Sequence, residues 1–363
     1  MSPKTSKSGE FASIKIIGSG LIGTSIGLAL ANEGVSVEMA DIDPKAARLA
    51  NDLMANPAPT PRPEIVLYAG PSSGLKTALE SEFQVNSALK FIDIGSVKTK
   101  SLLEISESMI PTRQFLATHP MAGREVGGAQ SARADLFQSR SWIYMPNDLL
   151  GSPVDPDLVA AGLWLIQTLG ATPVAMTAEK HDRAVALVSH LPQVAASLLA
   201  AQLRKADPEA LDLAGAGLRD TTRIAASNAA LWDEILSSNS NELLPLLINL
   251  QSDLATFIER LGALDSVSDL IEAGNQGRAK IPGKHGGAAR EYALLPVVIE
   301  DKPGQLASLF DECANAKVNV EDLTIEHSPG QFTGLITLAL SAKDAEILQA
   351  HLTKSGWSVH APR

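Results

Sequence analysis

Residues 13–43 read S-I-K-I-I-G-S-G-L-I-G-T-S-I-G-L-A-L-A-N-E-G-V-S-V-E-M-A-D-I-D, and this stretch decides the fold of the first half of the chain. A short β-branched run, typical of a buried parallel strand, precedes glycines spaced as G-x-G-x-x-G. Gly18 permits a tight turn, Gly20 lets a pyrophosphate approach the backbone, and Gly23 lets the following helix lie close to the strand. The pattern predicts a strand, a phosphate-binding turn and a helix.

A second strand, residues 35–40, ends at Asp41, which lies 23 positions after Gly18. A carboxylate there accepts hydrogen bonds from ribose hydroxyls and repels a 2′-phosphate, so the sequence favours NAD over NADP. Arg48 in the next helix can offset that preference. The helix N-terminus adds free N–H groups for the phosphates. The predicted cofactor-binding residues are Gly18, Ser19, Gly20, Leu21, Ile22, Gly23 and Asp41.

The composition of the 363-residue chain excludes several classes of protein. A net charge of −11 argues against nucleic acid or an anionic membrane as the main partner. We expect no membrane-spanning segment, and we expect the first ten residues to be a polar tail without a signal peptide. The single cysteine, Cys313, rules out an intrachain disulfide and suits a reducing cytoplasm. A cytoplasmic protein of two or three domains is predicted.

Strand and helix patterns alternate from residue 11 to residue 177 and predict a doubly wound, mostly parallel Rossmann-like sheet. Ligands bind such sheets at the carboxyl ends of the strands. The segments at Asp41, Ser96 and His119 each follow a predicted strand, so we expect all three to open onto one cleft. His119 is placed in the loop after a strand that ends at Ala117.

Residues 178–275 carry only helical patterns and predict an all-α domain. A helix over residues 242–261 has an apolar seam of 3-4 spacing, which indicates a homodimer interface, with a core helix as the alternative. The seam consists of Leu243, Leu247, Leu250, Leu254, Phe257 and Leu261. A Gly-rich linker over residues 276–291 and a β-α-β-β-α-β pattern over residues 292–363 follow, and the latter is the ferredoxin-like order.

Histidines are the clearest candidates for chemistry. His119 can accept a proton from a substrate hydroxyl while hydride leaves the same carbon, with Ser96 orienting its ring; a structural histidine is the alternative. His181 and His190 lie nine residues apart, on opposite faces of a straight helix, unless Pro192 bends it. No third ligand has suitable spacing, so no metal site is predicted.

Arg219 and Arg223 are placed at a predicted helix start, where cations oppose the helix dipole. This placement indicates an anion to be bound, and a guanidinium suits a carboxylate. The alternative is a surface ion pair between Asp220 and Arg223.

Five ordered motifs within residues 14–261 carry a family resemblance. They are G-S-G-L-I-G-T-S, D-I-G-S-V-K, H-P-M-A-G-R-E, H-D-R-A-V-A-L-V-S-H-L-P and R-D-T-T-R-I-A-A-S. Together they resemble the prephenate/arogenate dehydrogenase family of tyrosine biosynthesis. The tail, with D-K-P-G-Q-L and V-N-V-E-D-L, resembles an ACT domain, and the arrangement is similar to actinobacterial members.

The resemblance implies a catalytic role for His119 and a bonding role for Ser96. It implies a substrate side formed by Arg223, Glu125, His181 and His190. Gln193, at a position where the family pattern varies, and Arg219, four residues before Arg223, complete the predicted substrate-binding residues. Many prephenate-specific relatives have histidine where this chain has Gln193, which leaves prephenate or arogenate open as the substrate.

The implied reaction is NAD-dependent oxidative decarboxylation of prephenate to 4-hydroxyphenylpyruvate, with arogenate dehydrogenation to tyrosine as the alternative. A non-catalytic, NAD-binding amino-acid sensor is the alternative from another class, although the chain retains the whole catalytic set. A reductase of imines or β-hydroxy acids would explain neither the H-P-M-A-G-R-E loop nor the tail. The ACT-like tail implies an amino-acid effector, with tyrosine as the first candidate.

Overall fold

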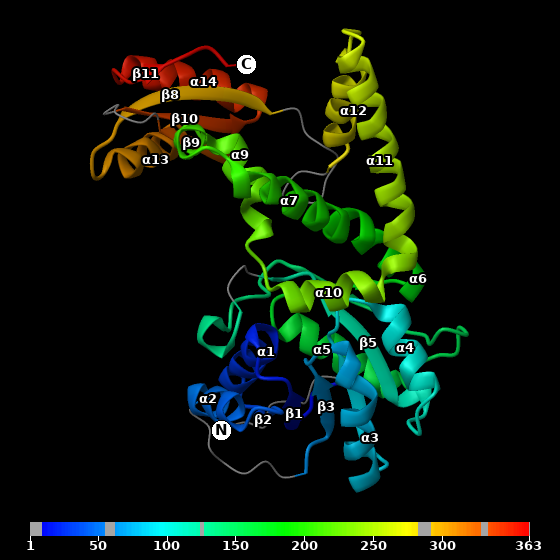
Figure 1. Ribbon diagram of the computed structural model, residues 1–363. Helices are drawn as coiled ribbons and strands as arrows, with labels where there is room; N and C mark the ends of the chain where they lie inside the picture. The colour runs from blue at the N-terminus through cyan, green and yellow to red at the C-terminus, as the bar shows by residue number, and fades with distance from the viewer. Residues whose placement is uncertain (1–8, 55–61, 124–126, 282–291, 328–332, 363) are drawn as a thin grey trace. The chain divides into compact units, whose positions relative to one another are not determined.

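The computed structural model describes residues 9–54, 62–123, 127–281, 292–327 and 333–362. The chain divides into two compact units, Met1–Ser252 and Asp253–Arg363. The first is built on a seven-stranded sheet with the strand order β2-β1-β3-β4-β5-β6-β7 (Figure 1). All neighbours in this sheet are parallel except β5 and β6, which pair antiparallel. The predicted Rossmann-like, mostly parallel sheet is confirmed.

The strands of this sheet are short and match the predicted runs closely. They are β1 (Ser13–Ile17), β2 (Ser36–Ala40), β3 (Ile65–Tyr68), β4 (Lys90–Asp93), β5 (Phe115–Pro120), β6 (Ser141–Tyr144) and β7 (Thr172–Ala175). The helices between them are α1 (Leu21–Asn32), α2 (Pro44–Leu53), α3 (Leu75–Val85), α4 (Lys98–Ser106) and α5 (Pro156–Thr168). Asp43 caps α2 by accepting a hydrogen bond from the Lys45 backbone, as its position before Pro44 predicts.

Apolar side chains cover both faces of the sheet, which explains why its strands are almost continuously hydrophobic. One buried cluster joins β1 and β2 to α1 and α5, with Ile14, Leu30 and Leu165 among its members. The other joins β3 and β4 to α3 and α4, with Phe91 and Ile105 among its members. This double layer holds the strand ends fixed, so the residues that follow them have defined positions.

The position of His119 differs from the prediction. We expected the strand to end at Ala117, whereas β5 continues to Pro120, and His119 pairs with Ile143 of the antiparallel neighbour β6. A partner strand supplies ladder hydrogen bonds that a single sequence does not reveal. His119 therefore belongs to a strand of the sheet and not to a loop.

The predicted single helix over residues 181–205 is two helices joined by a π turn. They are α6 (Ala178–Val185) and α7 (Leu191–Gln202), and the π turn is Ala186–His190. The combined segment Ala178–Lys205 is long and apolar enough to cross a membrane by length and composition alone, contrary to our expectation. His181 and Asp182 of this segment are buried, whereas its apolar side chains Leu187, Val188 and Leu198 are exposed, so only one side of the segment is covered.

Further helices complete the α-helical region. They are α8 (Pro208–Asp212), α9 (Ala216–Thr222), α10 (Ala229–Ser238), α11 (Ser240–Gly262) and α12 (Ser268–Ala279). The helix α12 was not predicted, and the predicted linker over residues 276–291 begins inside it. Residues 282–291 of that predicted linker lie outside the described residues.

The tail forms β8 (Ala293–Glu300), α13 (Gln305–Asn315), β9 (Asp322–His327), β10 (Thr333–Leu340), α14 (Ala342–Lys354) and β11 (Ser358–Val359). Its sheet has the order β11-β8-β10-β9, and all its neighbours are antiparallel. The predicted β-α-β-β-α-β order is confirmed. Both helices pack on one apolar cluster with the sheet, and Cys313 is buried in it as a small apolar residue.

Candidate functional site

The turn between β1 and α1 has the geometry that a dinucleotide requires. Gly18 has φ +114°, and a Cβ on it would lie 2.5 Å from the carbonyl carbon of Ala69. A Cβ on Gly23 would lie 2.1 Å from the Gly18 carbonyl oxygen. Gly20 instead faces open space, with nothing within 4 Å of its ideal Cβ. Two glycines are required by packing, and the third leaves room for a phosphate beside the backbone.

The N-terminus of α1 is free to receive an anion. Gly20 caps it without a side-chain hydrogen bond, and its first turn, which begins at Leu21 and Ile22, carries no acidic residue. The Ser19 hydroxyl is buried and has no partner among the described residues. Exposed N–H groups, a helix dipole and an orphaned hydroxyl together fit the pyrophosphate of NAD.

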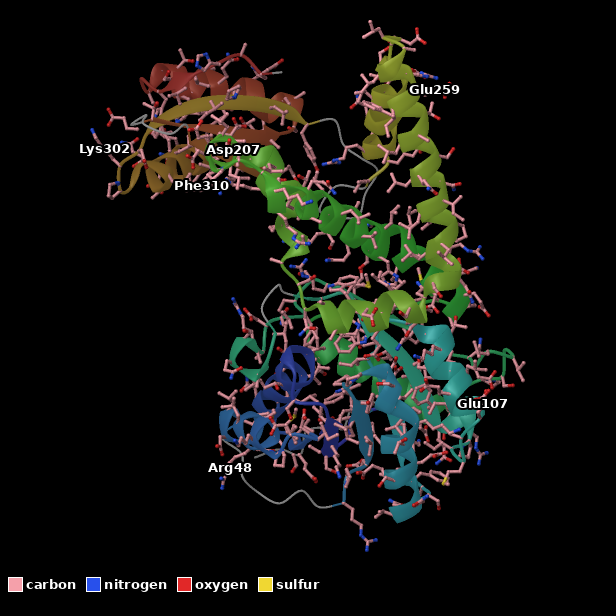
Figure 2. The ribbon with its side chains drawn as sticks, in the orientation of Figure 1. Arg48, Glu107, Asp207, Glu259, Lys302 and Phe310 are labelled. Atoms are coloured by element: carbon pink, nitrogen blue, oxygen red, sulfur yellow. The ribbon has the colours of Figure 1, made fainter. Side chains whose placement is uncertain are left out.

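Asp41 stands beside this turn, at the end of β2. Its Oδ2 accepts a hydrogen bond from the Ser19 backbone at 2.6 Å, and its Oδ1 accepts one from the Asp43 backbone at 2.9 Å. The carboxylate is thus fixed where a ribose would lie. Arg48, which we considered as an offset, lies exposed on the outer side of α2 (Figure 2).

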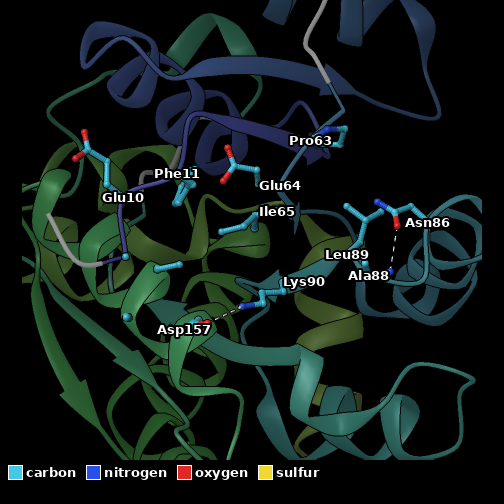
Figure 3. A pocket seen from close by; sticks show the side chains of 13 residues that line it. Glu10, Phe11, Pro63, Glu64, Ile65, Asn86, Ala88, Leu89, Lys90 and Asp157 are labelled. Atoms are coloured by element: carbon cyan, nitrogen blue, oxygen red, sulfur yellow. Dashed lines mark hydrogen bonds and ion pairs between the residues drawn. The ribbon is translucent and has the colours of Figure 1, made fainter. Parts of the chain in front are cut away.

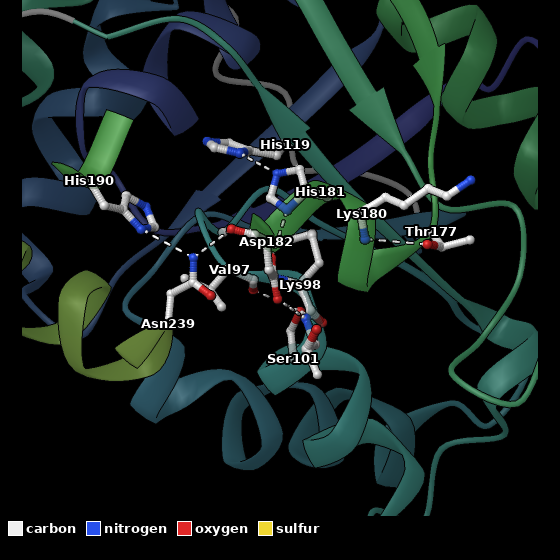
Figure 4. Close-up of polar contacts among 12 residues, drawn as sticks. Val97, Lys98, Ser101, His119, Thr177, Lys180, His181, Asp182, His190 and Asn239 are labelled. Carbon is white, nitrogen blue, oxygen red and sulfur yellow. Dashed lines mark hydrogen bonds and ion pairs between the residues drawn. The ribbon is translucent and has the colours of Figure 1, made fainter. Parts of the chain in front are cut away.

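A chain of three side chains ends at His119, as Figure 4 shows. His119 Nδ1 lies 2.8 Å from His181 Nε2, and His181 Nδ1 lies 2.7 Å from Asp182 Oδ1. His181 and Asp182 are buried, whereas His119 is half-buried at the carboxyl end of β5. The sequence reading anticipated the histidines but not Asp182, although its place next to His181 was visible.

The hydrogen bonds among Asp182, His181 and His119 determine which ring nitrogen of His119 carries the proton. Because a carboxylate only accepts, His181 carries a proton on Nδ1, and in a neutral His181 ring Nε2 is then the acceptor. His119 Nδ1–H then donates to that atom, so His119 Nε2 keeps a free lone pair. The ring is oriented with an acceptor available to a substrate hydroxyl.

The surroundings keep His119 neutral. Burial lowers its pKa well below the ordinary value, and neighbouring His181, Lys98 and His190 add to this, against Asp182. Burial alone would raise the pKa of Asp182, but hydrogen bonds from His181, Thr99 and Lys98 outweigh it and hold that pKa below its ordinary value. The site therefore contains His119 as a neutral base, connected through His181 to the ionised carboxylate of Asp182.

The π turn brings His190 to the same region. The side-chain amide of Asn239 donates to His190 Nδ1 at 3.2 Å and to the Asp182 carbonyl oxygen at 2.8 Å. His181 and His190 would face opposite sides of a straight helix. The inserted π turn, which ends two residues before Pro192, changes that angular relation. Such π turns are frequent at functional sites.

The other predicted residues have different surroundings. Ser96 is half-buried next to α4, and among the described residues it makes no hydrogen bond to His119, whose partner is His181. Gln193 is buried and donates to Ser227 Oγ at 2.8 Å. Glu125 lies outside the described residues.

The two arginines do not stand at a helix start. Arg219 lies in the last turn of α9 and Arg223 at its C-terminal cap, and both are exposed. The dipole argument for an anion is therefore wrong, because cations are favourable at a helix C-terminus. Within the described part of the chain, no hydrogen bond joins either arginine to His119.

A separate cavity of about 450 Å³ lies at the opposite edge of the sheet (Figure 3). Its lining residues lie at the amino ends of the strands and include Phe11, Ile65 and Lys90. Asp157, at the start of α5, also lines it. Ligands of doubly wound sheets bind at the other edge. The cavity is therefore not the site described above.

A mostly parallel sheet, a glycine-rich turn after its first strand and a carboxylate at the end of the second are the features of an NAD-dependent dehydrogenase. Residues 26–153 match the family model for the nucleotide-binding domain of prephenate dehydrogenase, and residues 177–270 match its dimerization domain. A probable prephenate dehydrogenase from Streptomyces niveus is 33% identical over 95% of this chain and 99% of its own length. The chain belongs to the prephenate dehydrogenase family.

Two solved structures have the same fold. Prephenate dehydrogenase from Aquifex aeolicus, in complex with hydroxyphenyl propionate and NAD+, has a TM-score of 0.64 and 23% identity. The match covers 76% of this chain and all of that one. Arogenate dehydrogenase from Synechocystis has a TM-score of 0.58 and 24% identity, over 74% of this chain and 99% of its own.

Proposed function

We propose that the chain catalyses the NAD-dependent oxidative decarboxylation of prephenate to 4-hydroxyphenylpyruvate. The observation that carries this proposal is the Asp182–His181–His119 chain, which ends in a free imidazole nitrogen at the carboxyl end of a Rossmann-like sheet. Family membership supplies the class of substrate, and the geometry supplies the base.

The protein has little bond-making to do in this reaction. NAD accepts the hydride when bound, and loss of the ring carboxylate as carbon dioxide makes the product aromatic. His119 Nε2 accepts the hydroxyl proton while the hydride leaves the same carbon, and it returns the proton to that oxygen once carbon dioxide has left and the ring is aromatic; its Nδ1–H stays bonded to His181 throughout. Gly18, Gly20, Gly23 and Asp41 hold the dinucleotide, so the contribution of the chain is orientation and proton acceptance.

Arg223 is our candidate for the substrate carboxylate, and Arg219, Glu125 and His190 are further candidates for binding the substrate. A guanidinium forms two parallel charge-assisted bonds to a carboxylate, which suits recognition of a dicarboxylate. Ser96 follows β4 and is offered as a second contact to the substrate hydroxyl or to His119.

Arogenate is the second candidate substrate, because the same fold occurs in an arogenate dehydrogenase and Gln193 replaces the histidine of many prephenate-specific relatives. The two substrates differ only in the side chain away from the reacting carbon, so His119 cannot distinguish them. The test is NADH formation with each substrate under identical conditions. A kcat/KM at least ten-fold higher with arogenate would reverse the assignment, and NADH formation with neither would refute the proposed function.

We also propose that the helical segment forms a homodimer. Large apolar side chains of α11 are exposed, including Leu254 (56%), Ile258 (61%) and Leu261 (53%). Such a row is unfavourable in water and typical of an interface. Leu243 of the predicted seam is instead buried, at 4% exposure. Sedimentation equilibrium of the whole chain tests the dimer.

The proposed domain arrangement is a Rossmann-like domain over residues 11–177, a helical domain from residue 178 and an ACT-like module over residues 292–363. The first loop of that module ends at Gly304, with φ +89°, directly before α13. A helix N-terminus next to a glycine suits an amino-acid carboxylate, and tyrosine is our candidate effector. A dimerisation module without a ligand is the alternative.

Truncation tests the effector proposal. Because α12 ends at Ala279, the shortened chain should end after that residue. It should retain basal turnover and lose inhibition by tyrosine. Unchanged inhibition would place tyrosine at the active site, as a competitor that resembles the product.

A further inference from the structure

A buried ion pair lies beneath His119 and has no role in the reaction as described so far. Lys98 has no exposed surface, and Asp93 is 2% exposed. Lys98 Nζ donates to Asp93 Oδ2 at 2.6 Å and to the Thr118 carbonyl oxygen at 2.8 Å. Thr118 is the residue directly before His119. The Lys98 side chain therefore fixes the backbone of β5 at the residue that precedes His119.

The backbone of the same lysine holds the other end of the histidine chain. Lys98 N donates to Asp182 Oδ1 at 2.9 Å, and Thr99 N donates to Asp182 Oδ2 at 2.8 Å. These are the first N–H groups of α4, so Asp182 caps that helix while it accepts from His181. One residue is thus tied to both ends of the chain that orients His119.

Asp93 also binds Thr118, the residue before His119. Its Oδ1 accepts from Thr118 N at 3.3 Å, and its backbone carbonyl accepts from the Thr118 hydroxyl at 2.8 Å. That hydroxyl also accepts from Trp142 Nε1 at 3.0 Å. Every polar group that we find around Thr118 is hydrogen-bonded, which makes the backbone next to His119 rigid.

We propose that Lys98, paired with Asp93, is the positioning residue of this enzyme: it fixes His119 from both sides and holds the ring in its neutral, proton-accepting form. The inference rests on the proposed function of His119, but it makes a claim about the protein that can be measured without substrate. Burying two charges costs free energy, and apolar side chains of similar size could fill the same space. Apolar side chains could not, however, donate the hydrogen bond that joins Lys98 to β5.

The electrostatic part of the proposal depends on the groups that face His119 within the described part of the chain. These are His181 from α6, His190 from the π turn, Lys98 from α4 and Asp182 from α6. Lys98 and the two histidines disfavour protonation of His119, whereas Asp182 favours it. Removing the lysine charge should therefore make His119 easier to protonate.

The test is an NMR titration of the His119 ring in the whole, substrate-free protein and in Lys98→Met. We expect the pKa of His119 to rise by about 0.5 to 1 unit in the variant, as expected for loss of one nearby like charge. Lys100→Met is the matched control, because it removes the same charge from the same helix, where Lys100 contacts Ser238. The control should leave the His119 titration unchanged.

If Lys98→Met does not fold, because it leaves the Asp93 carboxylate buried without a partner, the double variant Lys98→Met/Asp93→Asn removes both charges. We expect the same upward direction in the double variant. An unchanged pKa of His119 in a folded variant, or an equal rise in Lys100→Met, would overturn the proposal.

Turnover gives a second measurement. In Lys98→Met, kcat should fall on the order of 10- to 100-fold through misplacement of His119, with the KM for NAD unchanged. A fall in NAD affinity with kcat intact would overturn the positioning role. If the unmodified chain oxidises neither prephenate nor arogenate, the proposed function fails, and the titration still decides the claim about Lys98.

Discussion

Replacing His181 with Phe separates two interpretations of this histidine. The family resemblance places His181 on the substrate side, whereas the structure buries it completely and bonds its Nε2 to His119. Phe keeps a planar aromatic ring, somewhat larger than imidazole, and has no polar atom. It removes the acceptor for His119 Nδ1–H, while Asp182 keeps its two bonds to the start of α4.

The expected loss follows from one hydrogen bond. In the resting enzyme it is a neutral bond, but it becomes charge-assisted once His119 has taken the substrate proton. Hydrogen bonds to charged groups are worth about 1.5–3 kcal/mol. A neutral bond is worth about 0.5–1.5 kcal/mol, so the charge strengthens this bond by about 1–1.5 kcal/mol. Because about 1.4 kcal/mol corresponds to a factor of ten in rate, kcat should fall about 5- to 12-fold. The KM for substrate should change little, since a buried ring does not touch it.

Steady-state NADH formation at several pH values measures both constants, and a thermal melt establishes that the variant is folded. His119→Asn is the reference, with an expected fall of about 10²- to 10⁴-fold for loss of the base itself. A folded His181→Phe enzyme with kcat within two-fold of the unmodified chain would refute the reasoning. A raised KM with unchanged kcat would instead restore His181 to the substrate side.

Three further predictions concern the carboxylate site, the cofactor and pH. Arg223→Ala should raise the substrate KM by at least ten-fold and leave NAD binding intact; a loss of thermal stability alone would favour a structural role. Asp41→Asn should narrow the preference for NAD over NADP by about ten-fold or more, and an unchanged ratio of the two kcat/KM values would remove Asp41 from cofactor selection. Because the pKa of His119 lies below 6.5, kcat/KM should stay level as pH falls from 8 to 6.5 and decline only below that; a decline centred above pH 7 would contradict a neutral buried base.

The sequence predicted the sheet and the cofactor turn well because their signals are local. A β-branched run, three spaced glycines and a terminal Asp41 each act within a few residues of the chain. Clashes of 2.5 and 2.1 Å at Gly18 and Gly23 account for the glycines in physical terms. The tail was predicted for the same reason, since its alternating strands and amphipathic helices each form their own pattern.

The contacts around His119 could not be predicted in this way because they join distant segments. Asp182 lies 84 positions from Lys98, whose backbone it caps. Ser96, which follows the neighbouring strand, was predicted to orient His119, whereas the residue that lies 2.8 Å from His119 Nδ1 is His181, 62 positions away in the sequence. Arg219 and Arg223 were placed at a helix start because α9 begins earlier, at Ala216, than the polar pattern indicated.

The π turn at Ala186–His190 explains why a correct local argument gave an incomplete result. Nine residues in a regular helix turn through two and a half revolutions, so His181 and His190 should oppose each other. A π turn adds one residue to a revolution, and its cost in hydrogen-bond geometry is acceptable only where tertiary contacts compensate for it. Asn239 supplies such contacts, since it bonds both His190 and the backbone of Asp182. The irregular turn is therefore stabilised by the same residues that form the site, and Asn239→Leu, which removes the side-chain amide that contacts His190 and Asp182, should release His190 before it affects the sheet.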